Sequence, residues 1–176
     1  MKLIHLVLLC LLVMVVSGAF AMYAPTGGHP AGAVHSTFPA MRIGGDGGAR
    51  FVPIGWAAYV FGCAFFVGGS LMMALGIKPA LRTRAFWAFL VGGMILVLGA
   101  WSGLVRSYVR YLDHGYTGYF LGFPVPTAWM IYGIWGSAFG LIALFMFGFR
   151  VYVLPKEDEE AFEAFARELR ERKGGA

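Results

Sequence analysis

The 176-residue sequence is poor in charge: only 13% of its residues are Asp, Glu, Lys or Arg, against roughly 25% in a soluble domain. Three stretches, 51–77, 85–105 and 125–149, contain no Asp, Glu, Lys, Arg or His at all. Each is at least 21 residues long, and roughly 20 helical residues cross the hydrocarbon core of a bilayer. The sequence therefore predicts an all-α integral membrane protein.

The same absence limits what the spans can do. Helices that relay protons or coordinate ions keep an ionisable residue at depth, and b-type haem needs an axial His. With none available, we expect a protein that is not an enzyme and has no catalytic residue, metal site or cofactor. The two cysteines, Cys10 and Cys63, lie inside apolar runs and predict neither a disulfide framework nor zinc.

The first segment, residues 1–22, has two interpretations. Lys2, an apolar run and the sequence Ala19-Phe20-Ala21 resemble a signal peptide with its cleavage site. The apolar run is also long enough to span a bilayer, and we slightly favour a retained first helix. The chain is then a four-helix antiparallel transmembrane bundle, or a three-helix bundle after cleavage.

Three further regions follow. Residues 23–50 are rich in Gly and Pro and predict an irregular extracytoplasmic loop. Residues 51–153 form the three-helix transmembrane region, and residues 154–176 a cytoplasmic amphipathic helix and tail. Basic residues are densest between the second and third spans and after the last, so the positive-inside rule places those segments in the cytoplasm.

We accordingly expect a multi-pass protein of the bacterial inner membrane with its carboxyl terminus in the cytoplasm.

Arg106 and Arg110 begin the loop predicted over residues 106–124, and their spacing of four places both on one helix face. That face, in a loop rich in tyrosine, indicates either an aromatic belt with arginines reaching lipid head groups or a contact with acidic groups of a partner.

Small residues four apart predict where helices touch. Gly99 and Gly103 in the third span and Gly136 and Gly140 in the fourth each form such a strip, with weaker versions, Ala58 to Gly62 and Ser70 to Ala74, in the second span. Lipid gives no hydrophobic driving force between helices, so close backbone approach supplies much of the contact. Whether these strips face one another or another chain stays open at this point.

The tail from Pro155 to Lys173 predicts a soluble helix. Its acidic residues come first and its basic residues last, which complements the helix dipole. Phe162, Phe165 and Leu169, with Ala166, form a narrow apolar stripe that a lone helix would leave in water. The stripe can be covered by a partner, by the protein's own hairpin or by the membrane surface. Because acidic residues begin the helix, we favour the first two over lipid.

One stretch resembles a known family. Residues 120–129, Phe-Leu-Gly-Phe-Pro-Val-Pro-Thr-Ala-Trp, precede a last apolar helix, a basic exit at Arg150 and a charged tail. Over residues 85–165 this pattern resembles the small subunits encoded beside sodium/solute symporters, which have two membrane helices. Residues 1–77 have no counterpart in that pattern. The resemblance implies an accessory subunit that contacts a transporter through the loop motif.

Together these observations predict a non-catalytic accessory subunit of a membrane complex. Its expected partners are a larger polytopic membrane protein, of the sodium/solute transporter kind, and the lipid bilayer, with no nucleic acid. A structural subunit of a respiratory or other redox complex is the alternative. The residues expected to contact a partner are Arg106, Arg110, Phe123, Pro124, Trp129, Phe162, Phe165 and Leu169.

Overall fold

The computed structural model describes residues 2–25, 33–38, 40–43 and 47–174. Four of its helical segments are long and apolar enough to cross a bilayer. They are α1 (Leu3–Tyr23), α3 (Gly55–Leu75), α4 (Arg84–His114) and a last span over Val125–Phe147. The chain thus has the architecture of an all-α, multi-pass membrane protein, as the apolar stretches predict.

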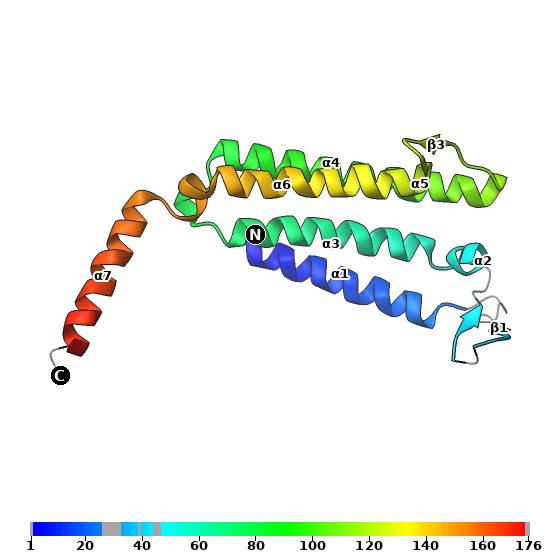
Figure 1. Ribbon diagram of the computed structural model, residues 1–176, viewed down its shortest axis with the longest axis horizontal. Coiled ribbons are helices and arrows are strands. Elements are labelled where there is room, and N and C mark those ends of the chain that lie inside the picture. The colour runs from blue at the N-terminus through cyan, green and yellow to red at the C-terminus, as the bar shows by residue number, and fades with distance from the viewer. Residues whose placement is uncertain (1, 26–32, 39, 44–46, 175–176) are drawn as a thin grey trace.

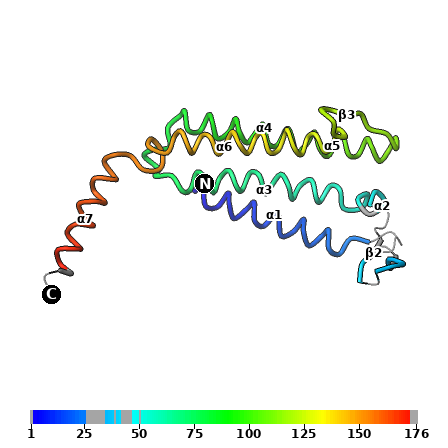
Figure 2. The backbone as a smooth tube through the Cα atoms, viewed as in Figure 1, coloured from blue at the N-terminus to red at the C-terminus, as the bar shows by residue number. Residues whose placement is uncertain are grey.

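The four spans run back and forth along one axis, so that each is antiparallel to the next (Figures 1 and 2). Helix α1 packs on α3, α3 packs on α4, and α4 packs on the last span. That last span is made of α5 (Val125–Ala128), the π-helical segment η2 (Trp129–Ile134) and α6 (Trp135–Phe147). Helix α4 is therefore the element that joins two antiparallel pairs.

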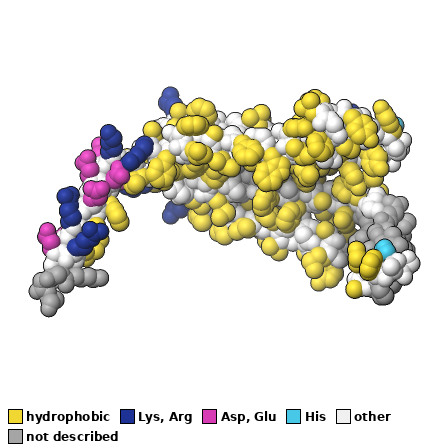
Figure 3. Space-filling view, in the orientation of Figure 1, with side chains coloured by type: hydrophobic (Ala, Val, Ile, Leu, Met, Phe, Trp, Pro, Cys, Tyr) yellow, Lys and Arg dark blue, Asp and Glu magenta, His cyan; other side chains and the backbone are white. Residues whose placement is uncertain are grey.

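The connections differ at the two ends of the bundle. At one end, a short turn with the 3-10 segment η1 (Pro79–Leu81) joins α3 to α4, and Lys78, Arg82 and Arg84 lie there. The chain leaves the last span at this same end through the π-helical segment η3 (Phe149–Val153) and continues as α7 (Lys156–Gly174). We call this the basic end (Figure 3).

At the opposite end, two short hairpins cap the spans. Strands β1 (Ala33–Val34) and β2 (Arg42–Ile43) pair antiparallel, and the short helix α2 (Gly47–Phe51) follows. Strands β3 (Tyr119–Phe120) and β4 (Phe123–Pro124) form the second hairpin, immediately before the last span. We call this the hairpin end. The described part of 23–50 thus holds a strand pair and a helical turn, which the sequence pattern did not predict.

The core lies near the basic end. Ala74 and Ile77 at the end of α3 pack with Phe86 and Leu90 at the start of α4, and all four are buried. Around them lie Leu3 of α1, Leu141 and Phe145 of α6, and Tyr152 of η3, so this cluster ties every span together. Phe86 is fully buried, and its ring lies 5.4 Å from that of Tyr152.

Helices α3 and α4 are also joined nearer the hairpin end. The indole of Trp101 lies against Gly62, where an added Cβ would come within 2.4 Å of the ring. Its Nε1 donates to the carbonyl oxygen of Tyr59 at 3.1 Å, and the Tyr59 hydroxyl lies 3.0 Å from the Ser102 hydroxyl. Gly62 therefore leaves room for the Trp101 ring, and the indole N–H of that ring has a hydrogen-bond acceptor within the apolar layer.

Helix α4 extends well past its apolar stretch, and this corrects the loop predicted over residues 106–124. Its 31 residues span about 46 Å at 1.5 Å per residue, more than the roughly 30 Å of the hydrocarbon core. The polar residues 106–114 continue the helix because no breaker occurs before Gly115, whose φ of 65° ends it in the left-handed conformation. The loop proper begins only there.

Candidate helix-docking groove

An open apolar groove runs between α4 and the last span. Its volume is about 560 Å³. Phe89, Gly93, Leu96 and Ala100 line it from α4. The last span contributes the rest of the lining, which is Trp129, Tyr132, Gly133, Gly136, Ser137, Gly140, Leu141 and Leu144. Small residues thus form much of both walls.

Three close contacts set how near the two helices approach beside this groove. The side chain of Leu141 covers Gly93, the Cβ of Ala100 lies against Gly133, and the indole of Trp129 covers Gly103. At each of these glycines an added Cβ would come within 2.5–2.8 Å of the neighbour. The glycines are therefore required for the observed spacing of α4 and the last span.

The predicted packing glycines divide into two groups. Gly103 makes the close contact with Trp129 described above. An added Cβ at Gly99, Gly136 or Gly140 would meet nothing within 4 Å in the described chain. Gly136 and Gly140 line the open groove, whereas Gly99 lies on α4 away from it. These three glycines therefore do not pack against another span of the described chain.

The predicted strips do not include two glycines that do pack, Gly93 and Gly133: Gly93 has no small residue four positions away, and Gly133 has only Ser137. Gly62, which closes the predicted strip that begins at Ala58, does pack, against the indole of Trp101. The contacts explain the miss: each of these glycines faces one larger side chain or a single alanine, not a second strip. Spacing alone does not report such one-to-one contacts.

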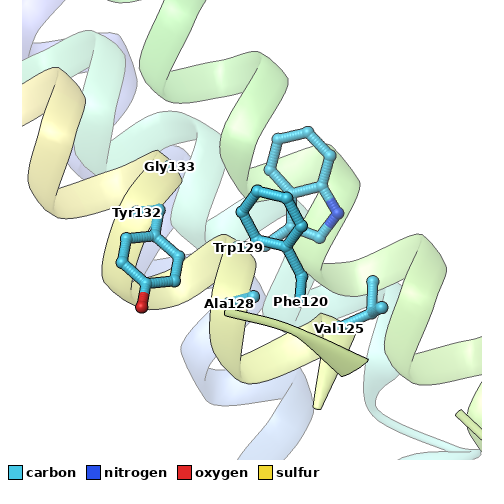
Figure 4. Close-up of a pocket in the computed structure, with 6 residues that line it drawn as sticks. All are labelled: Phe120, Val125, Ala128, Trp129, Tyr132 and Gly133. Atoms are coloured by element: carbon cyan, nitrogen blue, oxygen red, sulfur yellow. The ribbon is translucent and has the colours of Figure 1, made fainter. Parts of the chain in front are cut away.

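The groove is continued at the hairpin end by a pocket of about 440 Å³ (Figure 4). Phe120 of β3 lies over it, and Trp129, Tyr132 and Gly133 belong to both the pocket and the groove. Those three residues lie in η2, whose π-helical turns follow directly on the Pro126-containing start of the span. Such wide turns shift the side chains that follow and are frequent at functional sites.

The β3–β4 hairpin forms from the sequence that carries the family resemblance. Leu121 and Gly122 are its two turn residues and both have positive φ, 46° and 84°, as a type I′ turn requires. The rings of Phe120 and Phe123 each lie edge-on to Tyr132, with centroids 5.9 and 6.2 Å away. The Tyr132 hydroxyl donates to the carbonyl oxygen of Leu121 at 3.4 Å. The motif is thus folded onto the start of the last span.

The residues predicted to contact a partner lie in three places. Phe123 and Pro124 belong to β4, and Trp129 lines the groove, with 41% of its surface exposed. Arg106 and Arg110 are exposed on the helical extension of α4. Phe162, Phe165 and Leu169 are exposed on α7, at the other end of the molecule. The chain brings the first set together with the groove, but not the last.

Among residues 2–25, 33–38, 40–43 and 47–174, no three His, Cys, Asp or Glu side chains come close enough together to hold a metal ion. Of the histidines in the Gly/Pro-rich segment, His29 lies outside the described residues. His114 contacts the carbonyl oxygen of Arg110 through its Nδ1, 2.9 Å away.

No family model, curated protein or solved structure matches this chain.

Proposed function

We propose that this chain is a non-catalytic accessory subunit of a membrane complex, and that the groove between α4 and the last span receives a helix of a larger polytopic protein. The observation that carries this proposal is the position of Gly136 and Gly140, which line the groove with open space before them. In a bilayer, small residues in such a position allow another backbone to approach closely. Lipid chains gain little packing contact from such small residues.

The larger protein is, in this proposal, a secondary transporter of the sodium/solute type. This part rests on the resemblance of residues 120–129 and of the charged tail to small symporter-associated subunits. The hairpin built from that motif lies at one end of the groove and exposes Phe120, Leu121 and Phe123. A helix in the groove would meet these side chains, and Arg106 and Arg110 would lie near acidic groups beyond the hydrocarbon layer.

The orientation belongs to the same proposal. Lys2, Lys78, Arg82, Arg84 and Arg150 all flank span ends at the basic end, so we place that end in the cytoplasm of a bacterial cell. Both termini then lie on the cytoplasmic side of the inner membrane, with α1 retained. The side chains of Val7 and Ser17 are buried where α1 packs on α3, which supports a first helix that stays in the bundle.

Affinity capture of the tagged chain from native membranes in mild detergent tests the proposal. We expect a larger polytopic membrane protein to be recovered with it, and a transporter in particular. Gly136→Leu fills the groove and should remove that protein from the eluate. Gly92→Leu is the matched control, because Gly92 also faces open space on α4 but does not line the groove.

Recovery of the chain alone, from membranes that contain it at its natural level, would contradict the accessory role. Equal loss with Gly136→Leu and Gly92→Leu would show that the contact is not made through the groove. Capture of an oxidoreductase subunit would replace the transporter with the redox complex that the sequence left as the alternative.

A further inference from the structure

Helix α7 leaves the bundle sideways. Its axis runs steeply across the long axis shared by the four spans, at the basic end (Figures 1 and 2). Since the spans cross the bilayer along their long axis, a helix that turns across it at their end runs more along the membrane plane than across it, although its carboxyl end lies farther from the bundle than its start (Figure 1). Its course thus differs from that of a tail extending into the cytoplasm.

Two exposed ion pairs connect the first turns of α7 to the bundle. Lys78, in the connection between α3 and α4, pairs with Asp158, and Arg150 of η3 pairs with Glu159. Both cations lie where a span ends, so the pairs hold the start of α7 at the level of the membrane surface. They also neutralise two of the acidic residues whose presence near the start of the helix disfavoured lipid in the sequence analysis.

The apolar stripe of α7 has no cover in the described chain. Phe162, Phe165 and Leu169 expose 68%, 59% and 42% of their surfaces. The hydrophobic side chains of α7 lie on the side turned toward the end of the bundle (Figure 3). This is the side on which the bilayer would lie. The stripe does not dock on the protein's own hairpin, which was one of the covers favoured from the sequence.

The charged side chains of α7 are also distributed unevenly around the helix relative to the apolar stripe. At 100° per residue, Arg170 and Arg172 fall on the two edges of the stripe, and Arg172 pairs there with Glu168 at 2.8 Å. Glu157, Glu160, Glu163 and Glu171 fall on the opposite half of the helix, together with Arg167. The two acidic residues on the half that carries the stripe, Asp158 and Glu159, are those already paired with the bundle. Cations that flank an apolar stripe can reach head groups while their stems stay on the apolar surface.

We propose that α7 is an interfacial helix that lies on the leaflet at the basic end of the bundle. Phe162, Phe165 and Leu169 enter the boundary between head groups and acyl chains, and Arg170 and Arg172 contact anionic head groups. The membrane is the occupant of this face because the ion pairs set the helix at its level and the free acidic residues point away from it. The proposal is independent of any partner protein.

Collision accessibility of a nitroxide label in reconstituted vesicles tests this inference. The full chain carries Cys10→Ala and Cys63→Ala, and a single label site at Phe165→Cys, or at Ala164→Cys as the matched control on the opposite face. Both positions are exposed, so neither change disturbs a buried contact. In vesicles of phosphatidylcholine with phosphatidylglycerol, the label at 165 should collide more with oxygen than with a water-soluble nickel chelate. The label at 164 should show the reverse.

A second site, Leu169→Cys, should repeat the result of 165. Equal exposure of 164 and 165 to the nickel chelate would overturn the proposal, and so would protection of 165 from both reagents, which indicates a protein contact. In vesicles of phosphatidylcholine alone, the label at 165 should move toward water. An unchanged depth there would overturn the assignment of the arginines to anionic head groups. Only this chain is present, so the outcome does not depend on capture of a partner.

Discussion

The two antiparallel helix pairs use their small residues differently. Within α3, 28% of the most apolar 18-residue stretch is buried. A Cβ added at Gly68 of this helix would lie 3.2 Å from the Cβ of Cys10 on α1. Within the last span, none of the corresponding stretch is buried, and Gly136 and Gly140 meet nothing in the described chain. Gly93, Gly103 and Gly133 close contacts in the second pair as well, but Gly136 and Gly140 on its last span stay open.

The difference arises from the residues opposite the glycines. Between α1 and α3, Cys10 lies against Gly68 and the Phe61 ring lies against Gly18, and the two backbones approach along much of their length. Between α4 and the last span, Trp129 and Leu141 each cover one glycine of α4 and leave the remaining small residues to line the groove. This difference supports the proposal that the second pair is completed by another helix.

We expect the largest loss of stability from a substitution at a glycine that lies against an aromatic ring. Gly62→Val would place side-chain atoms inside the indole of Trp101 and break its hydrogen bond to Tyr59. We expect a loss of about 3 kcal/mol in the free energy of unfolding, at the upper end for overpacking. Titration of detergent-solubilised protein with a denaturing detergent measures it. Gly69→Val on the same helix faces open space and should cost far less.

A smaller effect distinguishes two glycines of one predicted strip. Gly103→Ala brings a methyl group within 2.6 Å of the Trp129 ring and should lower stability by about 1 kcal/mol, even after the gain in helix propensity. Gly99→Ala adds the same group in open space and should be neutral or stabilising. The same unfolding titration compares them. Equal effects would show that the two positions are not packed differently.

The turn of the β3–β4 hairpin offers the next test. Gly122 has a φ of 84°, so Gly122→Ala should cost about 1–2 kcal/mol locally. Hydrogen exchange at the amides of residues 120–124 should speed up, while α3 and α4 stay protected. Gly118→Ala is the control, because its added Cβ meets Val125 at an ordinary 3.7 Å and its φ is not positive. Unchanged exchange in Gly122→Ala would argue against the turn.

The smallest effect concerns the hydroxyl pair that links α3 and α4. Tyr59→Phe removes the contact with Ser102, and polar contacts between membrane helices are worth about 0.6 kcal/mol on average. Ser102→Ala should cost a similar amount, and the double variant should cost little more than either alone. Fully additive losses in this double-mutant cycle would mean that the two hydroxyls do not interact.

The sequence predicted the spans because the absence of charge over 20 residues is enforced by the bilayer itself. It predicted α7 within a residue of its observed start, since Pro155 and the order of acidic and basic residues mark a helix. It failed over residues 106–114, where polar residues suggested a loop although helices continue beyond the hydrocarbon layer until a breaker occurs.

The candidate site was harder to predict. Gly136 and Gly140 stood out by their spacing, but spacing does not say whether a strip is covered. That depends on which side chain of a neighbouring helix lies opposite, as Trp129 does for Gly103. The hairpin turn at Leu121 and Gly122 was also missed, because a two-residue Leu-Gly turn places a side chain at positive φ, where Asn or Gly is usual.

The central claim is that the groove between α4 and the last span holds a helix of another protein. Photo-crosslinking in native membranes tests it most directly, with a benzophenone amino acid at Leu96 or at Ile95. Both side chains are exposed, 66% and 62%, but only Leu96 lines the groove. We expect a crosslinked product with a larger membrane protein from position 96 and far less from 95. Crosslinks only to lipid or to a second copy of this chain from position 96 would contradict the claim.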